Sequence, residues 1–145
     1  MTTATPRIAN PDDAATVTRL LKAFFSHEGR EVRHLQQNVE AILCDPGRGF
    51  FTLADESAVA TTTIRISASG GASAEIEEIW VQPSARGRGL GASLLRNAID
   101  ECRRRGIESI ELRVTPDDRE LGIPDFYVKQ GFRHRGLQIM DYCGE

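Results

Sequence analysis

The sequence lacks most of the features that mark specialised classes of protein. No apolar run approaches the roughly 20 residues that span a bilayer, which excludes a membrane-spanning helix. The N-terminus has no basic segment followed by an apolar one, so it does not indicate a secretory signal. The three cysteines and three histidines lie far apart and have no metal-site spacing. We therefore expect reduced thiols, no metal, no membrane association and a cytoplasmic protein.

Positive charge is not in excess either. The sequence has 18 lysines and arginines against 21 aspartates and glutamates, which leaves a net charge of −3. This balance excludes a general affinity for nucleic acid. No internal repeat, low-complexity segment or linker interrupts the chain. A length of 145 residues suits a single hydrophobic core, so we expect one domain over residues 1–145.

The N-terminal part has the pattern of a short strand followed by two helices. Asn10 can cap the first helix, and Pro11 suits its first turn. Apolar residues then recur at helical spacing until Gly29, where we expect the helix to end; they are Val17, Leu20, Leu21 and Phe24. A second helix is predicted over residues 32–43.

The middle of the chain is rich in strand signals. "FFTLAD" and "AVATTTIRIS" predict a hairpin, and "AEIEEIWV" predicts a third strand that runs into a glycine-rich loop. A leucine-rich helix follows and ends in "RRRG". Its three arginines complement the helix dipole, with an anion-binding patch as the alternative interpretation.

The C-terminal part predicts a strand at 107–114, a short helix at 124–131 and two last strands at 132–135 and 138–143. The order of elements is typical of an α+β (mixed α/β) fold. We expect its strand–loop–helix–strand unit, residues 75–114, to be parallel and right-handed.

The stretch "RGRGLG", residues 86–91, places three glycines at alternate positions before the helix. Glycine tolerates positive φ, so backbone N–H groups can turn toward one point. The helix start adds free N–H groups and a positive dipole end. This combination predicts a phosphate-binding cradle; the simpler interpretation is a flexible surface turn.

Two other phosphate loops fit this stretch less well. A nucleoside triphosphate loop needs lysine and then serine or threonine after the glycines, whereas Ala92 and Ser93 follow here. A dinucleotide-binding pattern would use Gly87, Gly89 and Ala92, with Glu111 about 20 residues beyond. However, "QPSAR" separates the strand from the first glycine, where that pattern needs a tight turn.

"IWVQPSARGRGLG" resembles the acetyl-coenzyme A motif of the GCN5-related N-acetyltransferase (GNAT) superfamily, and "FYVKQGF", at 126–132, resembles the family's C-terminal signature. The predicted order of elements is also similar. The resemblance implies a mixed, mostly antiparallel, twisted sheet of about six or seven strands, flanked by about four helices, with a β-α-β coenzyme-binding unit. It also implies an acetyl-CoA-dependent N-acetyltransferase that moves an acetyl group to a primary amine by direct attack.

The resemblance also implies where the coenzyme binds. In the family, the pyrophosphate lies on the amides of this loop, and the pantetheine arm pairs with the preceding strand as an added strand. The strand after the helix, here 107–114, splays away to admit the thioester. The coenzyme-binding residues implied for this chain are Ile79, Trp80, Val81, Arg86, Gly87, Arg88, Gly89, Leu90, Gly91, Ala92 and Ser93.

The family's tyrosine corresponds to Tyr127. The resemblance implies that Tyr127 is the general acid that protonates the departing thiolate. Its simpler interpretation is a packing aromatic beside Phe126 and Phe132. A backbone N–H near Val81 would stabilise the negative charge on the thioester oxygen.

The segment "EIEEI" offers a general base, which the protonated amine needs before it can attack. Strand alternation puts Glu77 on the side of Ile79, and Glu78 on the other side with Ile76 and Trp80. A bulge in this strand would shift that parity. We favour Glu77 as the base, with Glu78 second; solvated carboxylates are the alternative.

The resemblance implies a small-molecule amine as the acceptor. In the family, the acceptor site is generally shaped by the first two helices and the final hairpin. Here "FFSHEGREVRHL" carries Glu28 and Glu31, which could hold a cationic amine, although a solvated helix end is the simpler interpretation. Family members are often dimers, so a homodimer is consistent with the resemblance. The alternative function is a non-catalytic acyl-CoA-binding or sensing module on the same fold.

Overall fold

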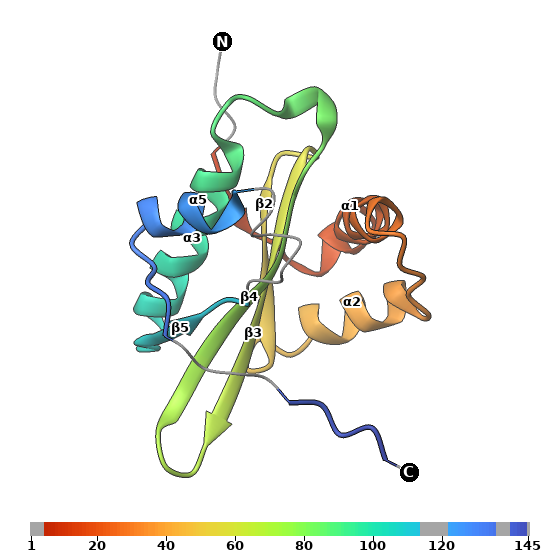
Figure 1. Ribbon diagram of the computed structural model, residues 1–145. Helices are drawn as coiled ribbons and strands as arrows, with labels where there is room; N and C mark the ends of the chain where they lie inside the picture. The colour runs from red at the N-terminus through yellow and green to blue at the C-terminus, as the bar shows by residue number, and fades with distance from the viewer. Residues whose placement is uncertain (1–4, 114–121, 136–139, 145) are drawn as a thin grey trace. The chain divides into compact units, whose positions relative to one another are not determined.

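The computed structural model describes residues 5–113, 122–135 and 140–144 (Figure 1). The chain divides into two compact units, Met1–Arg113 and Val114–Glu145. In chain order the elements are β1 (Arg7–Ile8), a 3-10 turn η1 (Pro11–Asp13), α1 (Ala14–His27), α2 (Leu35–Leu43), β2 (Gly49–Ala54), β3 (Ala58–Ser67), β4 (Gly71–Val81), a 3-10 turn η2 (Pro83–Ala85), α3 (Leu90–Arg104), β5 (Ser109–Glu111) and, in the second unit, α5 (Ile123–Lys129).

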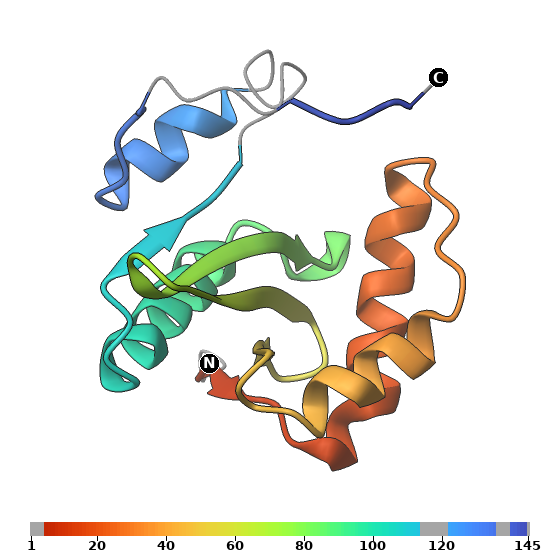
Figure 2. The same cartoon turned by 90° about the horizontal axis from the view of Figure 1, so that it is seen from below.

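A five-stranded sheet in the order β1-β2-β3-β4-β5 forms the centre of the first unit. The strands from β1 to β4 are antiparallel neighbours, whereas β4 and β5 are parallel and are joined through α3. The predicted hairpin of β2 and β3 and the predicted parallel β-α-β unit are therefore confirmed. Figure 1 shows α3 on one face of the sheet and α1 and α2 on the other, and Figure 2 shows the same layers from below.

A capped turn precedes α1, and the apolar face of the helix packs against the sheet. The Asn10 side chain accepts a hydrogen bond from the Asp12 amide at 2.9 Å, and Asp13 accepts one from the Asn10 amide at 2.8 Å. This capping box closes the short turn η1 before α1 begins. The apolar side of α1 then joins α2 and the sheet in one buried cluster, made of Val17, Leu20, Leu21, Phe25, Val39, Phe51, Leu53, Val59 and Trp80.

The opposite face of the sheet is covered by α3. Its buried side chains recur at helical spacing, as the sequence predicts; they include Leu90, Leu94, Leu95, Ala98 and Cys102. Alanines of β2 and β3 line the sheet beneath the start of the helix, and Ile79 and Val81 pack beside them. Small residues let the helix approach this part of the sheet closely, which fixes the start of α3 beside the end of β4.

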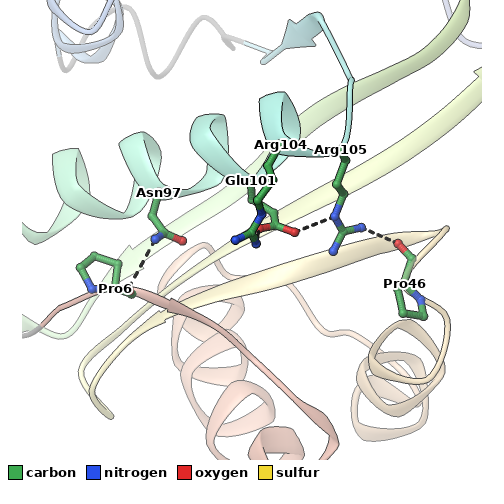
Figure 3. A network of polar contacts seen from close by, with 6 residues as sticks. All are labelled: Pro6, Pro46, Asn97, Glu101, Arg104 and Arg105. Atoms are coloured by element: carbon green, nitrogen blue, oxygen red, sulfur yellow. Dashed lines mark hydrogen bonds and ion pairs between the residues drawn. The ribbon is translucent and has the colours of Figure 1, made fainter.

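The arginines at the end of α3 belong to a structural network (Figure 3). Arg104 and Arg105 both pair with Glu101, whose side chain is buried. Arg105 also donates to the carbonyl oxygen of Pro46 at 2.7 Å, and Asn97 donates to that of Pro6 at 3.4 Å. These contacts tie α3 to the segments that precede β2 and β1. They favour the structural interpretation of these two arginines over an anion-binding patch.

The C-terminal strands are the part of the prediction that fails. Residues 132–135 and 140–143 form no strand in the part of the chain that the structure describes, and 138–139 lie outside it. "FRHR" has only one apolar side chain, while Met140 and Tyr142 are 89% and 94% exposed, so neither segment has a buried face to hold it in a sheet. Within the described residues the sheet therefore has five strands rather than six or seven, and β5 is shorter than predicted.

The three cysteines are free thiols, with Cys102 buried and the other two exposed. Burial raises the pKa of the Cys102 thiol, which keeps it unreactive. Across the described ranges, no three histidine, cysteine, aspartate or glutamate side chains gather into a group that could hold a metal ion. In those same ranges no helix combines the length and the apolar character that crossing a membrane requires.

Candidate active site

A β-bulge lies at the two glutamates of β4. Ala60 of β3 pairs with Ile79 of β4, and the next pair is Thr62 with Ile76. Between these pairs β3 advances by two residues and β4 by three. The extra residue leaves Glu77 and Glu78 together opposite Thr61. A bulge bends its strand, increases the local twist and redirects a side chain. The sheet is therefore irregular at the position where the sequence offers a base.

The bulge exchanges the two faces of β4. Ile79 pairs with Ala60, which packs on the α3 side. Thr62 is two residues beyond Ala60 in a regular strand, so Thr62 and its partner Ile76 also face α3. Strict alternation predicted that Ile76 shares a face with Trp80. That prediction is wrong, because Trp80 belongs to the cluster on the α1 side.

Glu78 and Glu77 occupy different environments. Glu78 is half-buried, whereas Glu77 is exposed. Burial raises the pKa of Glu78, and the neighbouring Glu77 carboxylate raises it further; the Thr61 hydroxyl and the Arg30 guanidinium act in the opposite direction. Arg30 follows α1, so Glu78 faces the α1 side of the sheet. A partly desolvated carboxyl with a raised pKa is a stronger base than a solvated carboxylate, which suits it to accept a proton.

The third glutamate of "EIEEI" has a structural role. Glu75 is buried and forms ion pairs with Arg65 of β3 and with Arg113, whose Nε lies 3.1 Å from Glu75 Oε2. Removing one member of such a group leaves the others without a buried partner. Glu75 also stands in the last β4–β5 pair, opposite Glu111. It therefore fastens the three strands together at the point where β5 separates from β4.

Beyond that point β4 has a free edge. β5 pairs with β4 only from Ser73 to Glu75, and no strand of the described residues pairs on this side from Ile76 to Val81. The other side of β4 stays paired with β3 as far as Val81. Exposed edge N–H and C=O groups can bind an extended ligand as an added strand. This geometry agrees with the splayed strand that the resemblance implies.

The glycine loop follows this edge after the short turn η2. The Arg86 amide donates to the Pro83 carbonyl oxygen at 3.4 Å and so closes η2. Gly87 and Gly89 have φ of +84° and +74°, and a Cβ at either position would meet no atom within 4 Å. The amides of residues 87–89 have no acceptor among the described residues, and the first amides of α3 have none within the helix. Open space above free amides at a helix start fits a phosphate group.

The Arg86 side chain returns to β4. Its Nε donates to the Val81 carbonyl oxygen at 3.0 Å, and its guanidinium carbon lies 4.8 Å from the centre of the Trp80 ring. Phe24 and His27 of α1 also contact this ring, with centroid distances of 5.9 and 5.3 Å. Sequence patterns did not predict this cluster, because its members come from α1, β4 and the loop. Only the backbone of Trp80 lies on the free edge of β4; its side chain lies on the α1 face.

Tyr127 lies in the second unit, in α5. Its ring packs 5.4 Å from that of Phe126 and 6.1 Å from that of Phe132, measured between centroids. Gly122, with φ of +73°, precedes α5, and the proline at the second position of the helix suits its first turn. The predicted short helix is thus confirmed, while the role of Tyr127 as general acid stays a prediction.

Comparisons with known proteins identify the family. The sequence model of the acetyltransferase (GNAT) family matches residues 14–132. An uncharacterised N-acetyltransferase of Methanocaldococcus jannaschii is 40% identical over 62 residues, which are 43% of this chain and 26% of that protein. The chain thus spans about a quarter of the length of this curated relative.

Solved structures show the same fold. A protein from Arthrobacter sp. FB24, proposed to be an acetyltransferase, is 28% identical and has a TM-score of 0.79, with 100% of this chain and 97% of that chain covered. The aminoglycoside N-acetyltransferase AAC(6')-Iy, solved with CoA, is 20% identical and has a TM-score of 0.77, with 94% and 92% covered. With the family match over most of its length, this chain belongs to the acetyltransferase (GNAT) family.

Proposed function

We propose that the protein is an acetyl-CoA-dependent N-acetyltransferase that acts on a primary amine of a small molecule. The observation that carries the proposal is the free edge of β4, from Ile76 to Val81, which contains the bulge and leads through the turn η2 to the glycine loop. The strand supplies a free edge that a long anionic thioester could follow and a partly buried carboxyl as a base, and the loop beyond the strand supplies a phosphate cradle. The aminoglycoside acetyltransferase with the same fold supports a small-molecule acceptor.

The residues present fit coenzyme A. The amides of Gly87, Arg88 and Gly89 and the first turn of α3, from Leu90, would hold the pyrophosphate. The backbone of Ile79, Trp80 and Val81 would pair with the pantetheine arm. Neither glycine of the loop could carry a Cβ without strain, because both have positive φ. When bound, acetyl-CoA supplies the acetyl thioester, whose C–S bond breaks as the amine nitrogen bonds to the acetyl carbon.

Glu78 is the better placed of the two candidate bases. Its carboxyl lies on the α1 face, where the family places the acceptor, and its raised pKa keeps it ready to accept a proton from the ammonium group. Glu77, which alternation alone favoured, is exposed and acts on Glu78 through its charge. A backbone N–H near Val81 would meet the thioester oxygen as it gains charge. Tyr127 would donate a proton to the departing sulfur.

We further propose that residues 1–145 act as one catalytic domain. The family match from 14 to 132 begins in the first structural unit and ends in the second, which supports this reading. The C-terminal signature with Tyr127 lies in the second unit and the glycine loop in the first. Loss of turnover on removal of residues 114–145, with the first unit still folded, would agree with a shared catalytic domain.

The test is thiol release from acetyl-CoA in the presence of amino acids, polyamines, aminoglycosides, other small amines and peptides. An N-acetyltransferase releases thiol with at least one acceptor and forms the corresponding amide, which mass spectrometry detects. Coenzyme binding by calorimetry without turnover of any acceptor would instead support the acyl-CoA-binding module. Absence of coenzyme binding would refute the cradle and the function together.

A further inference from the structure

The backbone and the side chain of Arg86 face different parts of the molecule. The backbone begins the glycine loop, and its amide is used by the turn η2. The side chain runs back to the end of β4, where Nε holds the Val81 carbonyl oxygen and the guanidinium covers the Trp80 ring. A guanidinium stacked on an aromatic ring and fixed by a hydrogen bond is well oriented. Moving it to a phosphate would break both contacts.

Trp80 connects this guanidinium to the acceptor face. The indole is only 7% exposed and belongs to the cluster beneath α1. Phe24 and His27, at the end of α1, contact the same ring. Glu78 precedes Trp80 by two residues on the same face, or about 7 Å along a strand. Arg86 and Glu78 therefore flank Trp80, with a positive charge at one end and the candidate base at the other.

We propose that the Arg86 side chain selects the acceptor, while the amides of the loop that it begins bind the coenzyme. It holds Trp80 as a wall of the acceptor site and places positive charge one side chain away from Glu78. An acceptor whose amine lies at Glu78 then presents its next polar group to Arg86. An anionic group there is attracted and a second ammonium is repelled, so amines that carry a carboxylate or phosphate are preferred to diamines and polyamines. The inference rests on the proposed function.

The experiment compares primary amines that carry an anionic group with diamines of the same length. The full-length wild type is expected to show higher kcat/KM with the anionic group. Arg86→Met should reduce this preference about tenfold, mainly through KM for the acceptor, because the positive charge at this end of the acceptor site is lost. Arg86→Lys keeps the charge and should restore much of the preference, although it cannot keep the planar stack. The calorimetric Kd for coenzyme A should change less than twofold in both variants.

A structural role alone would not produce this split. Arg86 is exposed, so circular dichroism should confirm that both variants fold. Trp80 is the only tryptophan, and its emission should respond to the acceptor in the wild type and less in Arg86→Met. As a contrast, Arg88→Met, in the same loop, should raise the coenzyme Kd and leave the preference among acceptors unchanged.

Three other results would overturn the inference. If Arg86→Met weakens coenzyme binding and leaves the acceptor preference intact, the guanidinium serves the phosphates and the inference is wrong, while the acetyltransferase function stands. If the wild type acetylates diamines at least as well as their anionic counterparts, the inference also fails. If the wild type acetylates no amine, the proposed function fails and the inference fails with it.

Discussion

Glu78→Gln should lower turnover and remove the acid limb of the pH–rate profile. Glu78 is half-buried in the bulge of β4. Its pKa is raised mainly by burial and, to a smaller extent, by the charge of the Glu77 carboxylate. A carboxyl acts as a base only when ionised, so kcat/KM should rise with pH through this raised pKa and then level off. Glutamine keeps the size of the side chain but cannot take the proton. Loss of a general base lowers the rate about 10²- to 10⁴-fold, or about 3 to 5 kcal/mol of activation free energy.

The same substitution should change stability in the opposite direction. Because the pKa of Glu78 is higher in the folded than in the unfolded chain, the folded chain binds more protons between the two values. The contribution of Glu78 to the free energy of unfolding is therefore present at low pH and is lost as pH rises through the folded pKa. Glutamine does not titrate, so Glu78→Gln does not lose this part of the free energy of unfolding as pH rises. The variant's melting temperature, relative to wild type, should thus increase with pH, which excludes unfolding as the cause of lost activity.

The assay is thiol release with an acceptor whose amine stays protonated from about pH 4 to 8. Glu77→Gln is the matched control. The charge of Glu77 raises the pKa of Glu78 in the wild type. Removing that charge should move the rise in kcat/KM to lower pH and preserve its plateau. The reasoning is refuted if Glu77→Gln abolishes the plateau while Glu78→Gln retains it. A limb that survives in both variants would assign proton removal to a water path.

Three further predictions test the loop, the acid and the bulge. Gly89→Val should raise the coenzyme Kd at least about tenfold by occupying the phosphate position, whereas Gly106→Val, with similar positive φ and equal open space at the far end of α3, should show only the cost of backbone strain, about 1–2 kcal/mol in unfolding. Tyr127→Phe keeps the ring packing and should reduce kcat about a hundredfold with unchanged coenzyme Kd, while exposed Tyr142→Phe should have no effect. Deletion of Glu77 should preserve folding by circular dichroism yet reduce kcat about a hundredfold, because a regular ladder no longer directs the base. An active deletion variant would show that the bulge is not needed.

Local sequence patterns predict most helices and strands of the first unit. The cap at Asn10, the helical spacing in α1 and α3 and the hairpin of β2 and β3 each depend on residues a few positions apart. The glycine loop is also local, since its backbone geometry follows from residue types that tolerate positive φ. The strands predicted near the C-terminus are wrong because their apolar side chains are not buried. Residues that favour strands do not form one in a segment that has no face to bury.

The contacts within the site are less predictable, because they join distant segments. Nothing near Arg86 in the sequence indicates that its side chain lies over Trp80, since the contact depends on where β4 ends and how η2 turns. The contact of His27 with the same ring requires α1 to pack across the sheet. The roles of Glu75 and Glu78 also differ only through tertiary partners. Glu75 finds two arginines, whereas Glu78 is partly buried near one.

The bulge does have a signal in the sequence, in the spacing of the apolar residues of β4. Ala74 and Ile76 occupy even positions, whereas Ile79 and Val81 occupy odd ones, and all four face α3. A strand can bury both pairs on one face only if it contains one extra residue between them. The extra residue falls at Glu77, beside the proposed base Glu78 and just beyond the last β4–β5 pair. One added residue thus keeps both apolar pairs of β4 in the core and confines the distortion of the strand to the two glutamates of the candidate site.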